Sequence, residues 1–151
     1  MRKILFTVAL CAAAQPRPNF SGNWLLNLSA SDYSAPNTAK PDKITVSIQQ
    51  QRDHFKYRWE RYAGGKKGAF EVDVTVGGPA YESDEAGVVS MEWKGDKLIV
   101  TTLYNPGQDR QSENIETWAL SADGRRLTDD VTVHPPQNRP PVHVVRVFDK
   151  Q

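Results

Sequence analysis

The sequence has few of the residues that disulfide-stabilised, metal-binding and highly charged proteins require. It has one cysteine and three histidines in 151 residues. One cysteine excludes an intrachain disulfide and the cysteine-rich zinc sites. The 19 basic and 18 acidic residues nearly balance, so no net field attracts nucleic acid or an anionic membrane surface. No apolar run approaches the roughly 20 residues of a membrane-spanning helix, which argues against membrane insertion.

Residues 1–14 differ in composition from the rest of the chain. Basic Arg2-Lys3 precedes a short apolar run that ends in three alanines. This layout is typical of a secretory signal peptide, although a buried N-terminal helix is the alternative. Leu10 stands where a lipid-attachment signal wants a small residue, so simple export is favoured over lipidation of Cys11. We therefore predict a signal peptide at 1–14, one domain at 15–151, and a secreted or periplasmic protein.

Apolar and polar residues alternate repeatedly in the rest of the chain. Phe55, Tyr57 and Trp59, for example, alternate with charged residues. This period of two predicts strands with one dry face and one wet face. The predicted strands lie near 23–28, 43–51, 54–62, 69–76, 88–93, 97–104, 113–121, 126–133 and 142–149, and a short tenth strand fits 80–83. The long connection 29–42 has room for one helical turn around 31–33.

Most predicted strands are joined by tight turns. Asp123-Gly124 is a strong hairpin signal, whereas the loop His134–Pro141 contains four prolines and cannot join a ladder. Tight turns make sequential strands neighbours, and a curled sheet buries its apolar face against itself. We predict an all-β domain, a single antiparallel up-and-down β-barrel of about eight to ten strands. A β-sandwich is the alternative fold.

The start of the predicted domain carries a recognisable motif. FSGNWLLNLSASDY includes Gly22 and Trp24, WALSADGRRLT forms a later hairpin, and VFDK lies near the C-terminus. Together they resemble secreted bacterial lipocalin-like proteins of the calycin type. The resemblance implies that Trp24 plugs one barrel end and stacks with Arg146. A second lipocalin motif, a disulfide and a C-terminal helix are missing, so ligand carriage does not follow from the resemblance alone.

Two charged residues are expected to meet inside the barrel. Asp129 shares a strand face with Leu127 and Val131. If the last hairpin pairs residue 133 with 142, Asp129 lies directly opposite Arg146; if it pairs 134 with 143, the two are diagonal neighbours. Because a lone buried carboxylate is costly, we predict an interior Asp129–Arg146 ion pair with a structural role.

The sequence shows no catalytic machinery. His134 and His143 flank the proline loop, but no third metal ligand is evident. His54 follows Asp53, where a surface ion pair is favoured over a catalytic dyad. We predict no catalytic residues, no metal site and no cofactor.

The aromatic residues of the dry face are the candidates for ligand binding. If the barrel holds a pocket, Tyr57, Trp59, Trp93 and Tyr104 are predicted to line it and to bind an apolar or planar molecule. The leading hypothesis is a non-catalytic carrier of a small hydrophobic molecule, with a monomer favoured. The first alternative is a solid barrel that binds a protein or envelope partner through the loops Ser29–Asp42 and His134–Pro141. The second is an enzyme built in the barrel mouth.

Overall fold

The computed structural model describes residues 16–151, so the predicted signal peptide at 1–14 lies outside the described residues. It contains ten strands and no α-helix in this part of the chain. The strands are β1 (Gly22–Leu26), β2 (Lys43–Gln51), β3 (His54–Ala63), β4 (Lys66–Thr75), β5 (Tyr81–Ser83), β6 (Gly87–Lys94), β7 (Lys97–Tyr104), β8 (Ser112–Leu120), β9 (Arg126–His134) and β10 (Val142–Lys150). The short strand expected near 80–83 is therefore confirmed as β5.

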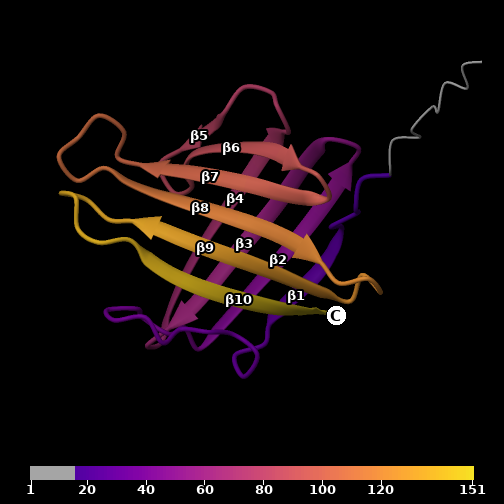
Figure 1. The fold of residues 1–151 in the computed structure, drawn as a ribbon, viewed down its shortest axis with the longest axis horizontal. Coiled ribbons are helices and arrows are strands. Elements are labelled where there is room, and N and C mark those ends of the chain that lie inside the picture. The colour runs from indigo at the N-terminus through magenta and orange to yellow at the C-terminus, as the bar shows by residue number, and fades with distance from the viewer. Residues whose placement is uncertain (1–15) are drawn as a thin grey trace, which may run out of the picture.

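All ten strands belong to one antiparallel sheet that curls into a nearly closed barrel (Figure 1). Their order is β4-β3-β2-β1-β10-β9-β8-β7-β6-β5, so the first and last strands pair and the other neighbours are sequential. The seam lies between β4 and the β5–β6 hairpin, where the Gly77 N–H donates to the Met91 carbonyl at 2.9 Å. The predicted up-and-down barrel is confirmed, and the sandwich does not form because tight turns keep every strand in one sheet.

The connection between β1 and β2 is irregular, and the helical turn expected at 31–33 is wrong. Asp32 instead forms a β-bridge with Val145 of β10. The Asp32 N–H donates to the Val145 carbonyl at 2.7 Å, and the Val145 N–H donates to the Asp32 carbonyl at 3.1 Å. These two bonds hold the backbone of the connection extended beside β10.

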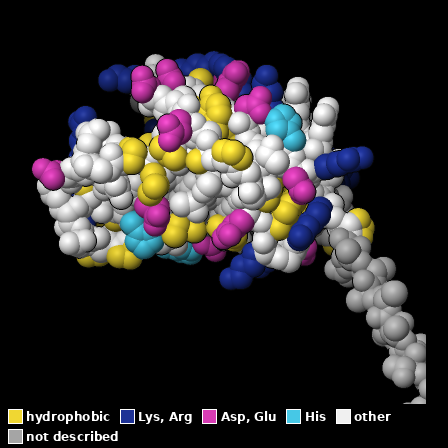
Figure 2. All heavy atoms as spheres, turned by 90° about the horizontal axis from the view of Figure 1, so that it is seen from above, with side chains coloured by type: hydrophobic (Ala, Val, Ile, Leu, Met, Phe, Trp, Pro, Cys, Tyr) yellow, Lys and Arg dark blue, Asp and Glu magenta, His cyan; other side chains and the backbone are white. Residues whose placement is uncertain are grey.

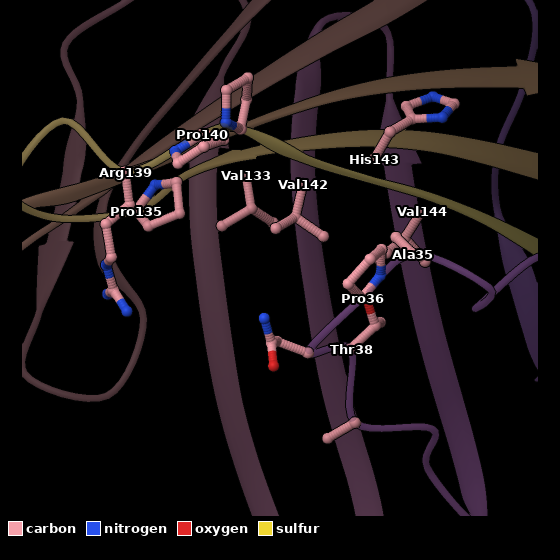
Figure 3. A pocket seen from close by; sticks show the side chains of 13 residues that line it. Ala35, Pro36, Thr38, Val133, Pro135, Arg139, Pro140, Val142, His143 and Val144 are labelled. Carbon is pink, nitrogen blue, oxygen red and sulfur yellow. The ribbon is translucent and has the colours of Figure 1, made fainter.

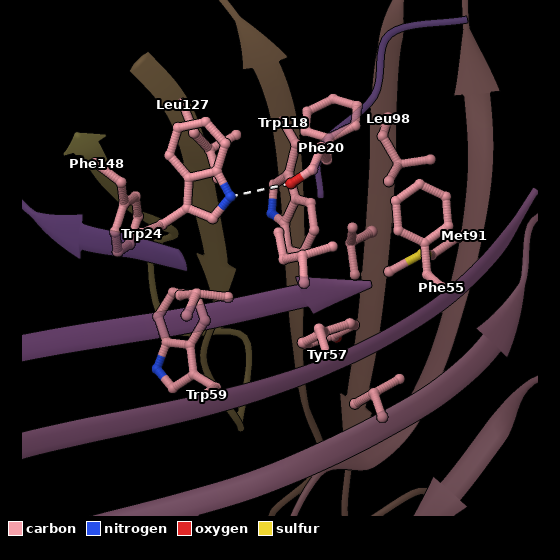
Figure 4. Close-up of a cluster of buried hydrophobic side chains, with 14 of the residues drawn as sticks. Phe20, Trp24, Phe55, Tyr57, Trp59, Met91, Leu98, Trp118, Leu127 and Phe148 are labelled. Atoms are coloured by element: carbon pink, nitrogen blue, oxygen red, sulfur yellow. Dashed lines mark hydrogen bonds between the residues drawn. The ribbon is translucent and has the colours of Figure 1, made fainter. Parts of the chain in front are cut away.

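One end of the barrel is closed by aromatic side chains (Figure 4). Phe20, from the segment before β1, is fully buried and lies 6.2–6.3 Å from the rings of Phe55, Trp93 and Trp118. Its carbonyl accepts a hydrogen bond from Trp24 Nε1 at 3.0 Å. Phe20 and Trp24 therefore plug this end together.

The stacking expected between Trp24 and Arg146 does not occur. The register pairs Trp24 with Lys150, and Lys150 Nζ lies 5.4 Å from the Trp24 ring. Gly22, with a φ of +143°, leaves room for this lysine, since a Cβ there would meet Lys150 Cε at 2.7 Å. Arg146 instead lies over the Trp59 ring, with 4.7 Å between Cζ and the ring centroid.

The outer surface mixes charges of both signs. Figure 2 shows basic and acidic side chains interspersed over one face, with apolar patches between them. Residues 16–151 contain no helix with the length and apolar character needed to cross a bilayer.

Candidate ligand-binding site

The end of the barrel opposite Phe20 carries an open pocket of about 710 Å³. Its walls are the β1–β2 connection and the β9–β10 hairpin (Figure 3). Val133 and Val142 point into the pocket, whereas the His143 ring points away from it. The lining is formed by residues 35–39 and 139–144 with Val133 and Pro135. Valine and proline side chains make it mainly apolar.

The pocket exists because β1 is shorter than the strand beside it. β1 pairs with only the last residues of β10, from Phe148 to Lys150, and the Asp32 bridge adds Val145. The beginning of β10, Val142–Val144, pairs with β9 alone. Residues 35–39 of the β1–β2 connection form no strand and do not pair with this part of β10. They form the other wall of the pocket.

Three charged side chains meet on the inner face of the strands below the pocket. Arg146 of β10 lies opposite Asp129 of β9, and its Nη2 is 2.8 Å from Asp129 Oδ2. The same nitrogen is 3.2 Å from Oε1 of Glu116 in β8. The predicted Asp129–Arg146 ion pair is present, with the 133–142 register, and Glu116 joins it. We call Glu116, Asp129 and Arg146 the charged cluster.

The members of the charged cluster differ in how well they are held. Glu116 Oε2 accepts a hydrogen bond from Trp118 Nε1 at 3.1 Å. Asp129 is 1% exposed, yet neither of its oxygens has an aligned hydrogen-bond donor in the described residues. Arg146 Nη2 is close to Asp129 Oδ2, but its N–H is poorly directed, so the contact is an ion pair without a good hydrogen bond.

Burial and charge act in opposite directions on the ionisation of the cluster. Burial raises the pKa of Asp129 well above its usual range, Arg146 lowers it in part, and Glu116 raises it further. Burial alone would lower the pKa of Arg146, but Asp129 and Glu116 raise it above its ordinary value. Arg146 is therefore charged, and burial favours the protonated form of Asp129.

Two solved structures share this architecture. Secretory abundant heat soluble protein 4 from Ramazzottius varieornatus superposes with a TM-score of 0.55 at 14% identity, covering 87% of this chain and 94% of that one. Apo lipid binding protein 8 of Caenorhabditis elegans gives 0.55 at 15% identity, covering 87% of this chain and 95% of that one. The fold is a lipocalin-like barrel. No protein-family model and no curated protein matches the sequence.

Three of the four aromatic residues predicted to bind ligand lie around the charged cluster of the lipocalin-like barrel. Trp59 is covered by Arg146, and Tyr57 packs edge-on against Trp118 at 5.4 Å. Burial raises the pKa of the Tyr57 and Tyr104 phenols, and the charge of Glu116 raises both further. Both phenols therefore stay neutral. Their contact with a ligand remains a prediction.

Trp93 lies apart from the other three. It belongs to the plugged end, where its ring is 6.2 Å from Phe20. Its Nε1 donates to Asp53 at 2.8 Å, and Arg17 lies over its ring. None of the four predicted residues lines the pocket at the open end.

Sequence reasoning missed several polar residues of this lipocalin-like barrel. Glu116 stands two residues before Trp118 on β8 and so shares its face, which was a signal for an inward carboxylate. Tyr33 and Thr38 lie in the irregular β1–β2 connection, where no periodicity shows direction. Their hydroxyl oxygens are buried without a partner in the described residues. Burial raises the pKa of the Tyr33 phenol, Arg146 lowers it in part, and Asp129 raises it further.

The rings of His54 and His143 form ion pairs outside this site. His54 Nε2 is 2.6 Å from Asp73, not paired with Asp53 as expected, because Asp53 accepts from Trp93. His143 Nε2 is 2.6 Å from Asp130 on the outer face. Within residues 16–151, no group of three or more His, Cys, Asp or Glu is placed to hold a metal ion.

Proposed function

We propose that this lipocalin-like barrel binds and carries a small, mostly apolar molecule without catalysis, as a secreted or periplasmic protein. The pocket at the open end is the observation that carries the proposal. Its volume of about 710 Å³ lies within the roughly 300–1,000 Å³ of typical ligand sites. Lipid binding protein 8 is a lipid binder by name, and its shared barrel supports the same use of the fold here.

The arrangement of the barrel favours binding at the open end. The largest fully buried side chains include Phe20, Trp24, Phe55 and Trp118, and they fill the plugged end. Val133 and Val142 at the open end are only partly buried, so apolar surface remains for a ligand to cover. Covering it is favourable at roughly 25 cal/mol per Å².

The proposal predicts that filling the pocket abolishes binding. Val142→Trp places a large ring where the ligand would lie, and we expect at least a tenfold loss of affinity for Nile red, measured by its fluorescence on titration. The matched control is Thr132→Trp, which adds the same ring to the outer face of β9. Binding that survives Val142→Trp in a folded protein, or that Thr132→Trp removes equally, would refute the proposal.

The alternative expected from the sequence, a partner that binds the loops 29–42 and 134–141, makes a different prediction. A carrier purified from its own host should yield a small molecule that leaves the protein on denaturation, seen by native mass spectrometry. An interaction module should yield no small molecule and no Nile red binding, but a protein partner lost on replacing residues 135–141.

A further inference from the structure

The charged cluster gives the interior of the barrel an unusual charge balance. It contains two carboxylates and one guanidinium, and a single nitrogen of Arg146 contacts both acids. With both carboxylates ionised the cluster carries one net negative charge; with a proton on Asp129 it is neutral. In neither state does Arg146 have positive charge to spare for an anion.

The charged cluster lies next to the pocket along β10. The side chains of Arg146 and Glu116 are 16% and 14% exposed, so neither is completely buried. Val144 lines the pocket, and Arg146 is the next inward residue of β10, about 6.6 Å further along the strand. A ligand with its apolar part against the valines can place one end on the charged cluster.

Buried polar atoms without hydrogen-bond partners occur both at the pocket and in the charged cluster. Thr38 lines the pocket, and its Oγ1, the Tyr33 hydroxyl and both Asp129 oxygens are buried with no hydrogen-bond partner among the described residues. Buried polar groups without partners are uncommon in proteins. Two of these oxygens belong to a carboxyl group that is 1% exposed, and Nε and Nη2 of Arg146 are likewise buried without an aligned acceptor. The balance of two acids against one guanidinium, and not the number of unmet hydrogen bonds, therefore sets the charge that the cluster favours.

We infer that the charged cluster binds the polar end of the ligand and selects an end that donates hydrogen bonds and is neutral or cationic, such as an alcohol or amine. This inference rests on the proposed function and names the class of its ligand. A hydroxyl or ammonium group supplies the donor that Asp129 lacks. A carboxylate adds a third acidic group beside Asp129 and Glu116. It also loses its hydration on binding, and the one guanidinium of the cluster already contacts both acids.

Two further arginines lie near the pocket, and each donates a hydrogen bond to a backbone carbonyl. Arg61 donates to the Ala39 carbonyl at 3.1 Å, and Arg139 donates to the Pro136 carbonyl at 3.3 Å. Burial, which raises the pKa of Asp129, also disfavours adding negative charge beside it. The selection that we infer acts on the polar end of the ligand, which lies at the charged cluster and not beside these two arginines.

The test compares three ligands with the same alkyl chain: dodecanol, dodecylamine and dodecanoate. Each competes with Nile red for the wild-type protein near neutral pH, below its critical micelle concentration. We expect dodecanol and dodecylamine to bind at least tenfold more tightly than dodecanoate. A preference for dodecanoate would overturn the inference and leave the proposed carrier function standing. Failure of Nile red and all three ligands to bind would refute the proposed function itself.

Removing both carboxylates should reverse the preference. The double variant Glu116→Gln/Asp129→Asn leaves Arg146 as the charged member of the cluster, so dodecanoate should become the tightest ligand and dodecylamine the weakest. The matched control, Glu113→Gln/Asp130→Asn, removes the same charge from the outer faces of β8 and β9 and should keep the wild-type order. Circular dichroism checks that both variants fold.

The remaining outcomes are also decisive. Equal changes in affinity for all three ligands in the inner double variant would show that the cluster does not contact the polar end, which overturns the inference. The same reversal in the outer control would assign the effect to overall charge and overturn it as well. If the inner variant does not fold, the wild-type ligand order alone decides.

Discussion

Replacing Phe20 tests whether the segment before β1 holds the barrel closed. Phe20→Ala removes a ring that is 0% exposed and leaves a hole facing Phe55, Trp93 and Trp118, each 6.2–6.3 Å away. Fully buried Phe→Ala changes cost about 3–5 kcal/mol because apolar burial is lost and a cavity remains. The backbone carbonyl that accepts from Trp24 is retained, so the side chain alone is measured. For a domain of this size, the loss corresponds to a melting temperature about 10–15 °C lower.

The assay is urea unfolding followed by tryptophan fluorescence, which reports on Trp24, Trp93 and Trp118 at the plugged end. Phe20→Leu is the control, because it keeps most of the apolar volume and should cost less than about 1.5 kcal/mol. A loss below about 1 kcal/mol for Phe20→Ala would show that residues 16–21 lie against the barrel without supporting it. Equal losses for the two variants would show that ring packing is not the cause.

Two further changes probe the cluster and a turn. Burial raises the pKa of Asp129 above its unfolded value, so its contribution to stability is full below about pH 4 and is lost as the pH rises through the folded pKa. The Asp129→Asn variant should therefore become more stable relative to wild type as the pH rises from about 4, which urea unfolding measures. A relative loss of stability would mean that Arg146 holds the pKa of Asp129 down. Gly87→Ala should lower the free energy of unfolding by at least about 1 kcal/mol more than Gly65→Ala. Both glycines have a positive φ, but only at Gly87 would an added Cβ meet the Leu103 carbonyl oxygen, at 2.6 Å. Equal thermal shifts would show that the backbone at Leu103 yields.

The strands and their inner faces were predictable because both depend on local sequence. Alternation at Phe55, Tyr57 and Trp59 fixed the inward face of β3, and all three are buried. Asp123-Gly124 marked the β8–β9 hairpin. The meeting of Asp129 and Arg146 on the inner face was predictable from the β9–β10 hairpin, but the long proline loop left two registers open, and the structure has the one that places them directly opposite.

Features that depend on contacts between distant segments were not predictable. The cation over Trp24 is Lys150 because β1 and β10 pair in a register that no short turn determines. The Asp32 bridge to Val145 joins residues far apart in sequence, and it displaces the expected helical turn. The pocket has the same origin, since it depends on how far β1 runs beside β10. Glu116 was the exception, because its place two residues before Trp118, on the same strand face, was visible in the sequence.

The two ends of the barrel differ in how tightly their side chains pack. The plugged end contains Phe20, Trp24 and Trp118, each 1% exposed or less, so tight packing there contributes to the stability of the domain. The open end contains partly buried valines, and Asp129, opposite Trp118 on the inner face, lacks aligned donors; both are poor sources of stability. Sites that bind commonly sacrifice local stability in this way. A ligand that covers Val142 and donates to Asp129 would remove both deficits at once, and binding should therefore raise the melting temperature by stabilising the end that packs least well.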